Sequence, residues 1–263
     1  HDNINQDLYS YKISGSVKDA KLNLIGHGNL NEINFNFDAQ EKQININNLN
    51  FNYQKINFLS KNIKIKSKSG KYLIDGNIEN LKTSIKPNSL FNLVNIKQDY
   101  LSSKNILLES KNFFSFELNQ NNKIKNIKIN SIVKFDEIYF SKNYKNIIFL
   151  KDGTINSIYE NDKFTAEINS NFVFISDLKS KNEYKNNNLK LSLQGKNDQK
   201  INVKGNISNK KIPINPKFFI NFFQFDANLL SEKNINIETD TKFQFELNNN
   251  KIKNHLVNST INI

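Results

Sequence analysis

The chain has 263 residues, of which 37% are hydrophobic, and its net charge is +12. It contains no cysteine, which excludes disulfides, thiolate metal sites and a cysteine nucleophile. The positive charge would attract phosphate groups, but no stretch has the dense basic clustering typical of a nucleic-acid site. We therefore interpret most lysines as solvated residues on the outer faces of strands.

The sequence begins at His1 and contains no methionine. Its most apolar runs, at 146–150 and 218–223, are far too short to cross a bilayer as a helix. We expect the sequence to be a piece of a longer chain, with any membrane anchor lying outside it.

From the N-terminus onward, apolar side chains occupy alternate positions, separated by Asn, Lys, Ser, Asp and Glu. This period predicts β-strands with one apolar and one hydrated face, which suits an antiparallel sheet. The apolar positions expected to line the inner face are Ile33, Phe35, Phe37, Ile44, Ile46, Phe51, Tyr53, Ile63, Ile65, Tyr72, Ile74, Ile78, Phe114, Phe116, Leu118, Ile127, Ile129, Val203, Phe243, Phe245 and Leu247.

Short polar breaks separate the predicted strands. Those at 119–123 and 248–251, rich in Asn and Lys, predict hairpin turns. Evidence for helices is thin. The segments near 87–100 and 215–224 each predict either a short helix or a loop that plugs one end of the sheet, and Pro216 suits a helix entry.

In several predicted strands a glycine occupies a position where the alternation calls for an apolar side chain. These glycines are Gly15, Gly28, Gly76 and Gly205. Glycine inside a strand marks a bulge, a bend or the close approach of another group. We predict that these glycines thin the inner face where the sheet bends, and that the bend shapes a trough.

The second half of the sequence partly repeats the first at an offset of about 129 residues, so that about 60–133 matches about 189–263. "GNIEN" at 76 corresponds to "GNISN" at 205, and Pro87 to Pro216. A repeat of this kind is typical of elongated architectures. We expect residues 1–263 to form one continuous β-groove fragment whose second copy is cut by the end of the chain.

The succession "YKISGSV" (11–17), the strands of 49–81 and "FSFELNQNNKIKNIKINSIVKFDEIYF" (114–140) resemble the repeats of AsmA-like proteins, particularly the YhdP-type branch of Gram-negative bacteria. The resemblance implies an all-β fold: a long, twisted, curved and mostly antiparallel sheet that forms a half-open, taco-like groove. That family is similar to the bridge-like lipid transfer proteins.

The resemblance also implies a function, namely non-enzymatic transport of phospholipid, with acyl chains held along an apolar groove between the inner and outer membranes. It further implies a periplasmic location, with an inner-membrane anchor outside this chain. The alternative is a structural extracellular β-repeat, such as an adhesin stalk or β-solenoid, with a closed core.

The chemistry of an enzyme is missing from the sequence. The three histidines, His1, His27 and His255, are far apart and have no metal-ligand spacing. We find no phosphate loop, nucleophile elbow or dinucleotide fingerprint. We therefore expect no catalytic residue, no metal, no cofactor and no nucleic-acid partner, while the sequence leaves the oligomeric state open.

Overall fold

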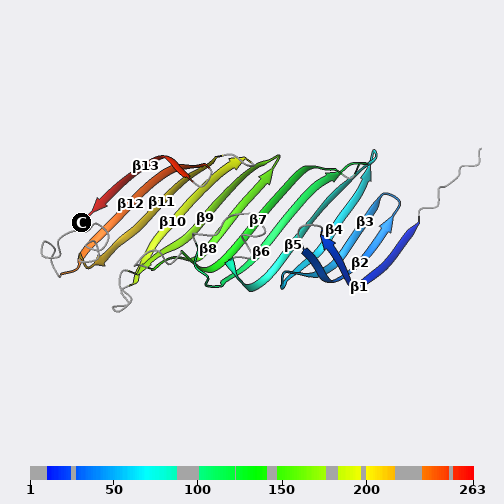
Figure 1. The fold of residues 1–263 in the computed structure, drawn as a ribbon, viewed down its shortest axis with the longest axis horizontal. Coiled ribbons are helices and arrows are strands. Elements are labelled where there is room, and N and C mark those ends of the chain that lie inside the picture. Colours follow the sequence, from blue (N-terminus) through cyan, green and yellow to red (C-terminus); the bar gives the residue numbers. More distant parts are fainter. Residues whose placement is uncertain are drawn as a thin grey trace, which may run out of the picture. The chain divides into compact units, whose positions relative to one another are not determined.

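A computed structural model of the chain describes residues 11–24, 28–87, 101–121, 123–140, 147–175, 183–196, 200–216, 233–248 and 251–263. Thirteen β-strands account for almost all of these residues (Figure 1). The strands are β1 (Lys12–Leu24), β2 (Gly28–Gln40), β3 (Gln43–Tyr53), β4 (Ile56–Lys68), β5 (Lys71–Ile85), β6 (Ile106–Leu118), β7 (Ile124–Tyr139), β8 (Ile147–Glu160), β9 (Lys163–Ile175), β10 (Glu183–Lys196), β11 (Ile201–Ile214), β12 (Ile235–Asn248) and β13 (Lys251–Asn262).

The strands form one open antiparallel sheet in which each strand pairs with its neighbours in the sequence. The sheet does not close, so β1 and β13 are its edges. The predicted all-β class and antiparallel order are therefore confirmed. The predicted helices or loops near 87–100 and 215–224 lie mostly outside the described residues.

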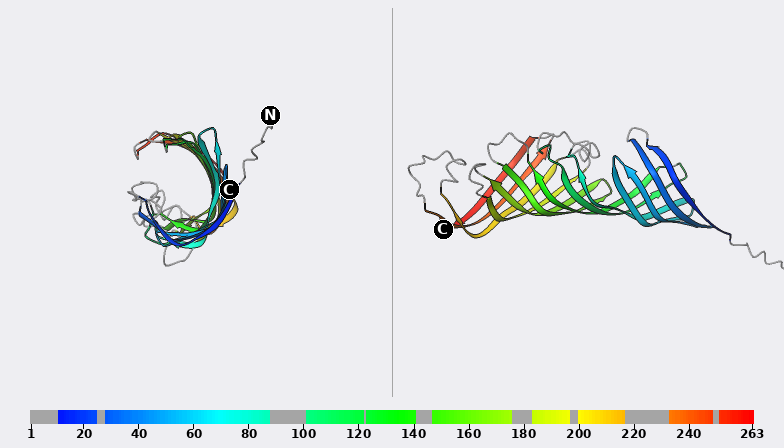
Figure 2. Two further views of the ribbon diagram at one scale, coloured as in Figure 1. Left: turned by 90° about the vertical axis from the view of Figure 1, so that its right-hand side faces the viewer. Right: turned by 90° about the horizontal axis from the view of Figure 1, so that it is seen from below.

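The chain divides into two compact units. The first comprises residues 1–81 and 111–130, and the second comprises residues 82–110 and 131–263. Within the second unit, β8 to β13 lie side by side and follow a curved course (green to red in Figure 2). Each unit is described by itself below.

In the first unit, the register places the apolar alternate residues of neighbouring strands on the same face. One row across β1 to β5 reads Gly15, Phe37, Ile46, Ile63 and Gly76. The adjacent row, on the opposite face, reads Ser16, Asn36, Asn47 and Asn62. The amide Nδ2 of Asn62 donates to Oδ1 of Asn47 at 2.7 Å, so the polar row is a hydrogen-bonded ladder.

The second unit separates its faces in the same way. A row from β8 to β13 reads Ile155, Ile168, Leu191, Gly205, Phe243 and Val257. The neighbouring row, on the other face, reads Asn156, Glu167, Ser192, Lys204, Gln244 and Leu256. Directly opposed residues of antiparallel strands share a face, so each row is continuous.

In the second unit, several of the most buried apolar side chains lie at the strand ends that carry the longer connections. They include Ile85, Ile106, Ile214 and Ile237, all less than 9% exposed. Full burial of a side chain of this size stabilises the fold by about 1.5–3 kcal/mol. In the first unit, Phe51 and Ile56 are equally buried beside the two-residue β3–β4 turn.

β-Bulges keep the apolar residues on one face along strands of 11 to 16 residues. Apolar positions change phase within a strand: Ile46 is even-numbered, whereas Leu49 and Phe51 are odd-numbered. Between them Asn48 adopts a φ of 52°, and the β2–β3 register shifts. The extra residue restores Leu49 and Phe51 to the face of Ile46, because one added residue reverses the alternation.

Other strands use the same device. Asp19, Glu32, Asp152 and Asn254 have φ values of 51–53°, and each lies at a register shift. Asn and Asp enter this left-handed conformation more readily than other non-glycine residues. The Asn and Asp content of the strands thus has a structural use beyond hydration.

Asparagine side chains satisfy the backbone groups that bulges leave unpaired. At the β11 bulge, Asn209 is buried and its Nδ2 donates to the carbonyl oxygens of Lys210 (3.1 Å) and Ile237 (2.9 Å). Its Oδ1 accepts from the backbone N–H of Thr239 at 3.1 Å. At the first bulges, Asn34 accepts from the N–H of Asp19 and donates to the carbonyl of Glu32. Because these asparagines pair the backbone N–H and C=O groups at the bulges, the irregular backbone costs little stability.

The in-phase glycines lie beneath aromatic rings. A Cβ atom added to Gly205 would lie 2.2 Å from Cζ of Phe243, its cross-strand partner. The same construction at Gly15 meets Phe37 at 2.7 Å, and at Gly195 it meets Phe164 at 2.5 Å. The ring of the neighbouring strand therefore covers the glycine backbone, an arrangement known to support sheets.

The ring contacts explain why these positions carry no side chain, and the role of the glycines in bending the sheet stays a prediction. Gly15 and Gly205 lie in regular register, and the bulges fall at other residues. Gly28 has a φ of 100° at the start of β2, where it serves the turn from β1. Gly15 and Gly205 must lack a side chain because a ring from the neighbouring strand occupies the space that a Cβ atom would take.

Residues 129 positions apart occupy equivalent places. Lys71 pairs with Glu117 at 3.3 Å, and Lys200 pairs with Glu246 at the same distance. Gly76 lies against Phe114, as Gly205 lies against Phe243. Asn80 and Asn209 are both buried, and each donates to the carbonyl of the following residue at 3.1 Å. This agreement in place and partner is what the sequence repeat predicts.

The ring above Gly205 generates a prediction about stability. We expect Gly205→Ala to lower the free energy of unfolding by about 1–3 kcal/mol, because the new methyl overlaps Phe243. In a Phe243→Ala background only Cδ2 of Leu191, 2.7 Å from the added Cβ, still overlaps it, so the same change should cost clearly less. Urea denaturation of the four proteins in this cycle measures the coupling. An equal cost in both backgrounds would contradict the role of the ring.

Asn209 gives a second prediction. Asn209→Leu leaves the Ile237 carbonyl and the Thr239 N–H unpaired in a buried site, so we expect a loss of about 2–5 kcal/mol of stability. Asn202→Leu makes the same chemical change at an exposed position of the same strand and should cost less than about 1 kcal/mol. Thermal denaturation of both variants distinguishes buried pairing from a general effect of removing an amide.

Candidate functional site

The apolar face of the second unit continues to the edge of the sheet without a covering layer among the described residues. Leu189 and Val203, near its centre, are buried, whereas Val257 and Ile252 on β13 are 60% and 62% exposed. Phe243 and Phe245 stack along β12 with ring centroids 6.3 Å apart. The face is thus a continuous apolar surface that becomes open to water at β13.

The first unit presents a similar surface. Phe37, Ile46 and Ile63 lie in its middle rows, and Phe114 and Phe116 of β6 stack with centroids 6.1 Å apart. Toward the short turns, Ile13 is 54% exposed and Tyr72 is 48% exposed. Large apolar side chains are normally covered in a packed core, so this exposure sets the apolar face of the first unit apart from an ordinary core.

The residues predicted to line the groove gather on the apolar face of each unit. In the first unit the pairings place there Ile33, Phe35, Phe37, Ile44, Ile46, Phe51, Tyr53, Ile63, Ile65 and Ile74, and alternation extends the face to Tyr72, Ile78, Phe114, Phe116 and Leu118. In the second unit it includes Val203, Phe243, Phe245 and Leu247. Ile127 and Ile129 lie on the half-buried side of β7. Contact with lipid stays a prediction.

Several residues of this face were missed by the sequence analysis. Leu191, Ile168 and Ile155 complete the central row of the second unit, and Val257 ends it. Their own alternation was a sufficient signal. Phe164 and Phe135, which cover Gly195 and Gly153, could not be matched to their glycines before the register was known.

The opposite face of the second unit is polar and basic. A shallow hollow of about 580 Å³ is lined by Lys190, Lys204 and Lys242, with Glu167 and Ser192 at its side. Leu256 of β13 also lines this hollow. Leu256 and its neighbour Val257 therefore lie on opposite faces of the sheet.

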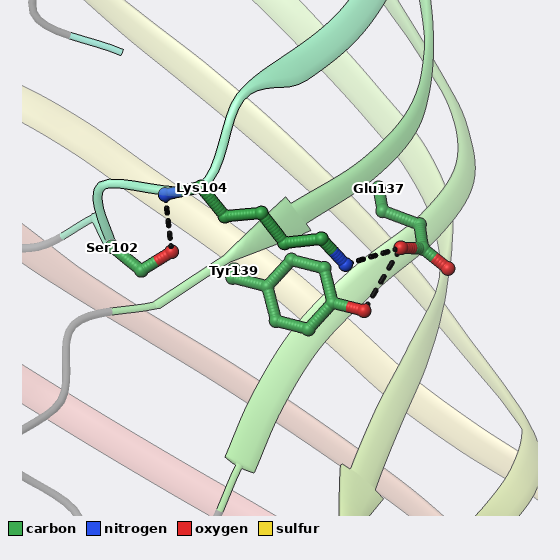
Figure 3. A network of polar contacts seen from close by, with 4 residues as sticks. All are labelled: Ser102, Lys104, Glu137 and Tyr139. Carbon is green, nitrogen blue, oxygen red and sulfur yellow. Dashed lines mark hydrogen bonds and ion pairs between the residues drawn. The ribbon is translucent and has the colours of Figure 1, made fainter. Parts of the chain in front are cut away.

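A polar cluster at the end of β7 fixes the segment that precedes β6 (Figure 3). Nζ of Lys104 lies 3.0 Å from Oε2 of Glu137 and 3.6 Å from the ring centroid of Tyr139. The hydroxyl of Tyr139 donates to the same Oε2 at 2.8 Å, and its ring stacks on Phe149. The backbone N–H of Ser102 donates to the carbonyl of Tyr139 at 2.9 Å. The cluster is a structural clamp.

The charges of the clamp stabilise one another. Partial burial opposes the charge on Lys104, but hydrogen bonds to Tyr139 and Glu137 outweigh it and raise the Lys104 pKa. Burial likewise opposes the charge on Glu137, and the Lys104 and Tyr139 hydrogen bonds overcome it, which lowers the Glu137 pKa. Burial raises the pKa of Tyr139. The phenol therefore stays protonated and can donate to Glu137.

The described residues offer little for bond-making chemistry. No group of three or more His, Asp or Glu side chains among them could hold a metal ion. In the same ranges, none of the helical segments has the length and apolar character needed to span a membrane. What the arrangement offers chemically is an apolar surface on one side and lysine and amide groups on the other.

Comparison with known proteins gives no relative. No family model, no curated protein and no solved structure matches this chain. The function is therefore argued from the sheet itself.

The clamp predicts a pH dependence. Because the folded pKa of Glu137 lies below its ordinary value of 4.5, its stabilisation is complete above that value and is lost as the pH falls through the folded pKa. Lys104 and Glu137 are both partly exposed, so we expect their ion pair to contribute no more than about 1 kcal/mol to the free energy of unfolding. Melting temperatures below pH 4.5 should fall less steeply for Glu137→Gln than for the unsubstituted protein.

Glu167→Gln serves as the matched control, since the described part of the chain gives Glu167 no ion pair. Its pH profile should follow that of the unsubstituted protein. A Glu137→Gln profile that coincides with both would show that the clamp does not contribute to stability.

Proposed function

We propose that the chain is a non-enzymatic phospholipid-binding segment whose apolar sheet face holds acyl chains. The observation that carries this proposal is the continuous apolar face that no other layer covers among the described residues. The resemblance to AsmA-like repeats, stated above, points the same way.

The energetics suit acyl chains. Each methylene that leaves water for an apolar surface gains about 0.8 kcal/mol, so a chain of ordinary length is held by many small contributions. Apolar contact has no preferred direction, so a bound chain can slide from one row of side chains to the next. The rows of Phe, Ile, Leu and Val offer such steps from strand to strand, while the hydrated face keeps the sheet in solution.

The resemblance also suggests where the protein works. We propose that the chain is part of a periplasmic protein anchored in the inner membrane through segments outside this sequence. Phospholipid would then move toward the outer membrane along its own gradient or be driven from elsewhere. No catalytic group, metal or cofactor takes part in such a transfer.

The alternative, a structural extracellular repeat with a closed core, fits the observed topology less well. A β-solenoid winds its strands into coils, whereas these strands form an antiparallel meander in sequence order. A closed core also requires a second layer or a closed sheet, and the present sheet is open.

Two adjacent residues of β13 give a matched test. Val257 and Leu256 are 60% and 51% exposed and lie on opposite faces. We expect Val257→Asp to reduce phospholipid uptake several-fold, because a carboxylate on the apolar face repels acyl chains. Leu256→Asp places the same charge on the polar face and should leave uptake unchanged. Fluorescent phospholipid binding to the delipidated protein measures both.

Native mass spectrometry of the purified chain provides an independent readout, since co-purifying phospholipid should appear as added mass. Photocrosslinkers at Phe35 and Phe116 should label lipid. A delipidated protein that takes up no phospholipid and forms no crosslink at either position would falsify the proposal.

A further inference from the structure

The short-turn end of the first unit carries a concentration of lysines around a hollow. The hollow has a volume of about 660 Å³ and lies next to the β2–β3 and β4–β5 turns. Four lysines line it together with a single glutamate, Glu41, which leaves three net positive charges. The lysines are Lys12, Lys42, Lys66 and Lys68.

These lysines are held in place by the strands but are not neutralised. The backbone N–H of Ser67 donates to the carbonyl of Lys42 at 2.8 Å, which joins the two turns. All four lysine side chains are exposed, and the described ranges contain no ion-pair partner for any of them. Some lysines elsewhere are neutralised, since Lys71 and Lys200 have carboxylate partners at 3.3 Å.

Acidic groups near the hollow are few or already engaged. Asp38, in the next row of the polar face, accepts from Oγ of Ser14 at 2.6 Å and from Nδ2 of Asn47 at 3.1 Å. Asp75 lies in the same row, opposite Lys64. The end of the unit therefore presents positive charge that is not balanced locally.

Exposed apolar groups accompany the lysines at this end. Ile13 and Ile44 oppose Ala39 in the last apolar row, and they are 54% and 37% exposed. Tyr11 lines the hollow and is 54% exposed. Tyrosine favours the headgroup level of a bilayer, and lysines near an anionic membrane each contribute about 1 kcal/mol of attraction.

From this combination we propose that the short-turn end of the first unit docks on a membrane surface that carries anionic phospholipid. The lysines around the hollow contact headgroup phosphates, and Ile13, Ile44 and Tyr11 reach the acyl boundary. The inference rests on the proposed function only in taking a membrane as the partner, because docking needs the charged end and not uptake of lipid along the sheet.

The test is flotation of the purified chain with vesicles of phosphatidylglycerol and phosphatidylcholine, at low and high salt. We expect binding that requires phosphatidylglycerol and weakens with salt. The triple variant Lys42→Gln/Lys66→Gln/Lys68→Gln should reduce vesicle affinity on the order of 100-fold, from about 1 kcal/mol for each lysine.

The control is Lys190→Gln/Lys204→Gln/Lys242→Gln, which removes the same charge from the hollow of the second unit. It should keep vesicle binding within a few-fold of the unsubstituted protein. All six positions are exposed, so unfolding midpoints should stay unchanged and report correct folding.

Three results would overturn the inference: no binding of the unsubstituted protein to phosphatidylglycerol vesicles, an equal loss in both triple variants, or binding to immobilised polyglutamate that matches vesicle binding and uses the same lysines. The last would assign the surface to an acidic protein. Uptake of a soluble short-chain phospholipid, measured in parallel, tests the proposed function separately, since Val257→Asp should reduce uptake several-fold and leave flotation intact.

Discussion

The constraint on which this structure depends is that long antiparallel strands must keep all their apolar side chains on one face. Strict alternation would place the apolar side chains on one face only if they were all at odd-numbered or all at even-numbered positions of a strand. Within most of these strands, however, the apolar residues change from even-numbered to odd-numbered positions or the reverse. A residue in left-handed conformation, such as Asn48 or Asp152, adds one position and restores the face. Buried asparagines then pair the displaced backbone groups. The apolar face, the polar ladder and the proposed lipid surface all follow from this correction.

The second determinant of the apolar face is the pairing of a glycine with a ring from the next strand. Gly205 under Phe243 and Gly15 under Phe37 turn an apparent gap into a close contact. A phenyl ring that lies down on the neighbouring backbone covers its hydrogen bonds from water and presents a smooth surface. Such a surface suits a ligand that is held by area and not by directed bonds. The same contact would link stability to the proposed function, because the residues that hold the strands together also form the proposed lipid surface.

Polarity also differs along the strands. The ends with longer connections hold the buried residues Ile85, Ile106 and Ile237 and, close by, the Lys104–Glu137–Tyr139 clamp. In the first unit, the ends next to the β2–β3 and β4–β5 turns carry unpaired lysines beside exposed Ile13 and Ile44. The proposed acyl-chain binding therefore concerns the apolar face, and the proposed membrane docking concerns this charged end.

The sequence by itself determined the all-β class, the antiparallel order, the turn at 119–123 and many of the residues of the apolar face, because a period of two is a local property of the chain. It also contained the repeat, from which the equivalent Lys71–Glu117 and Lys200–Glu246 pairs follow. It could not determine which ring covers which glycine, because that depends on the register between strands. The tertiary structure alone brought Lys12, Lys42, Lys66 and Lys68 around one hollow, since these lysines come from strands and turns that only backbone pairing places side by side.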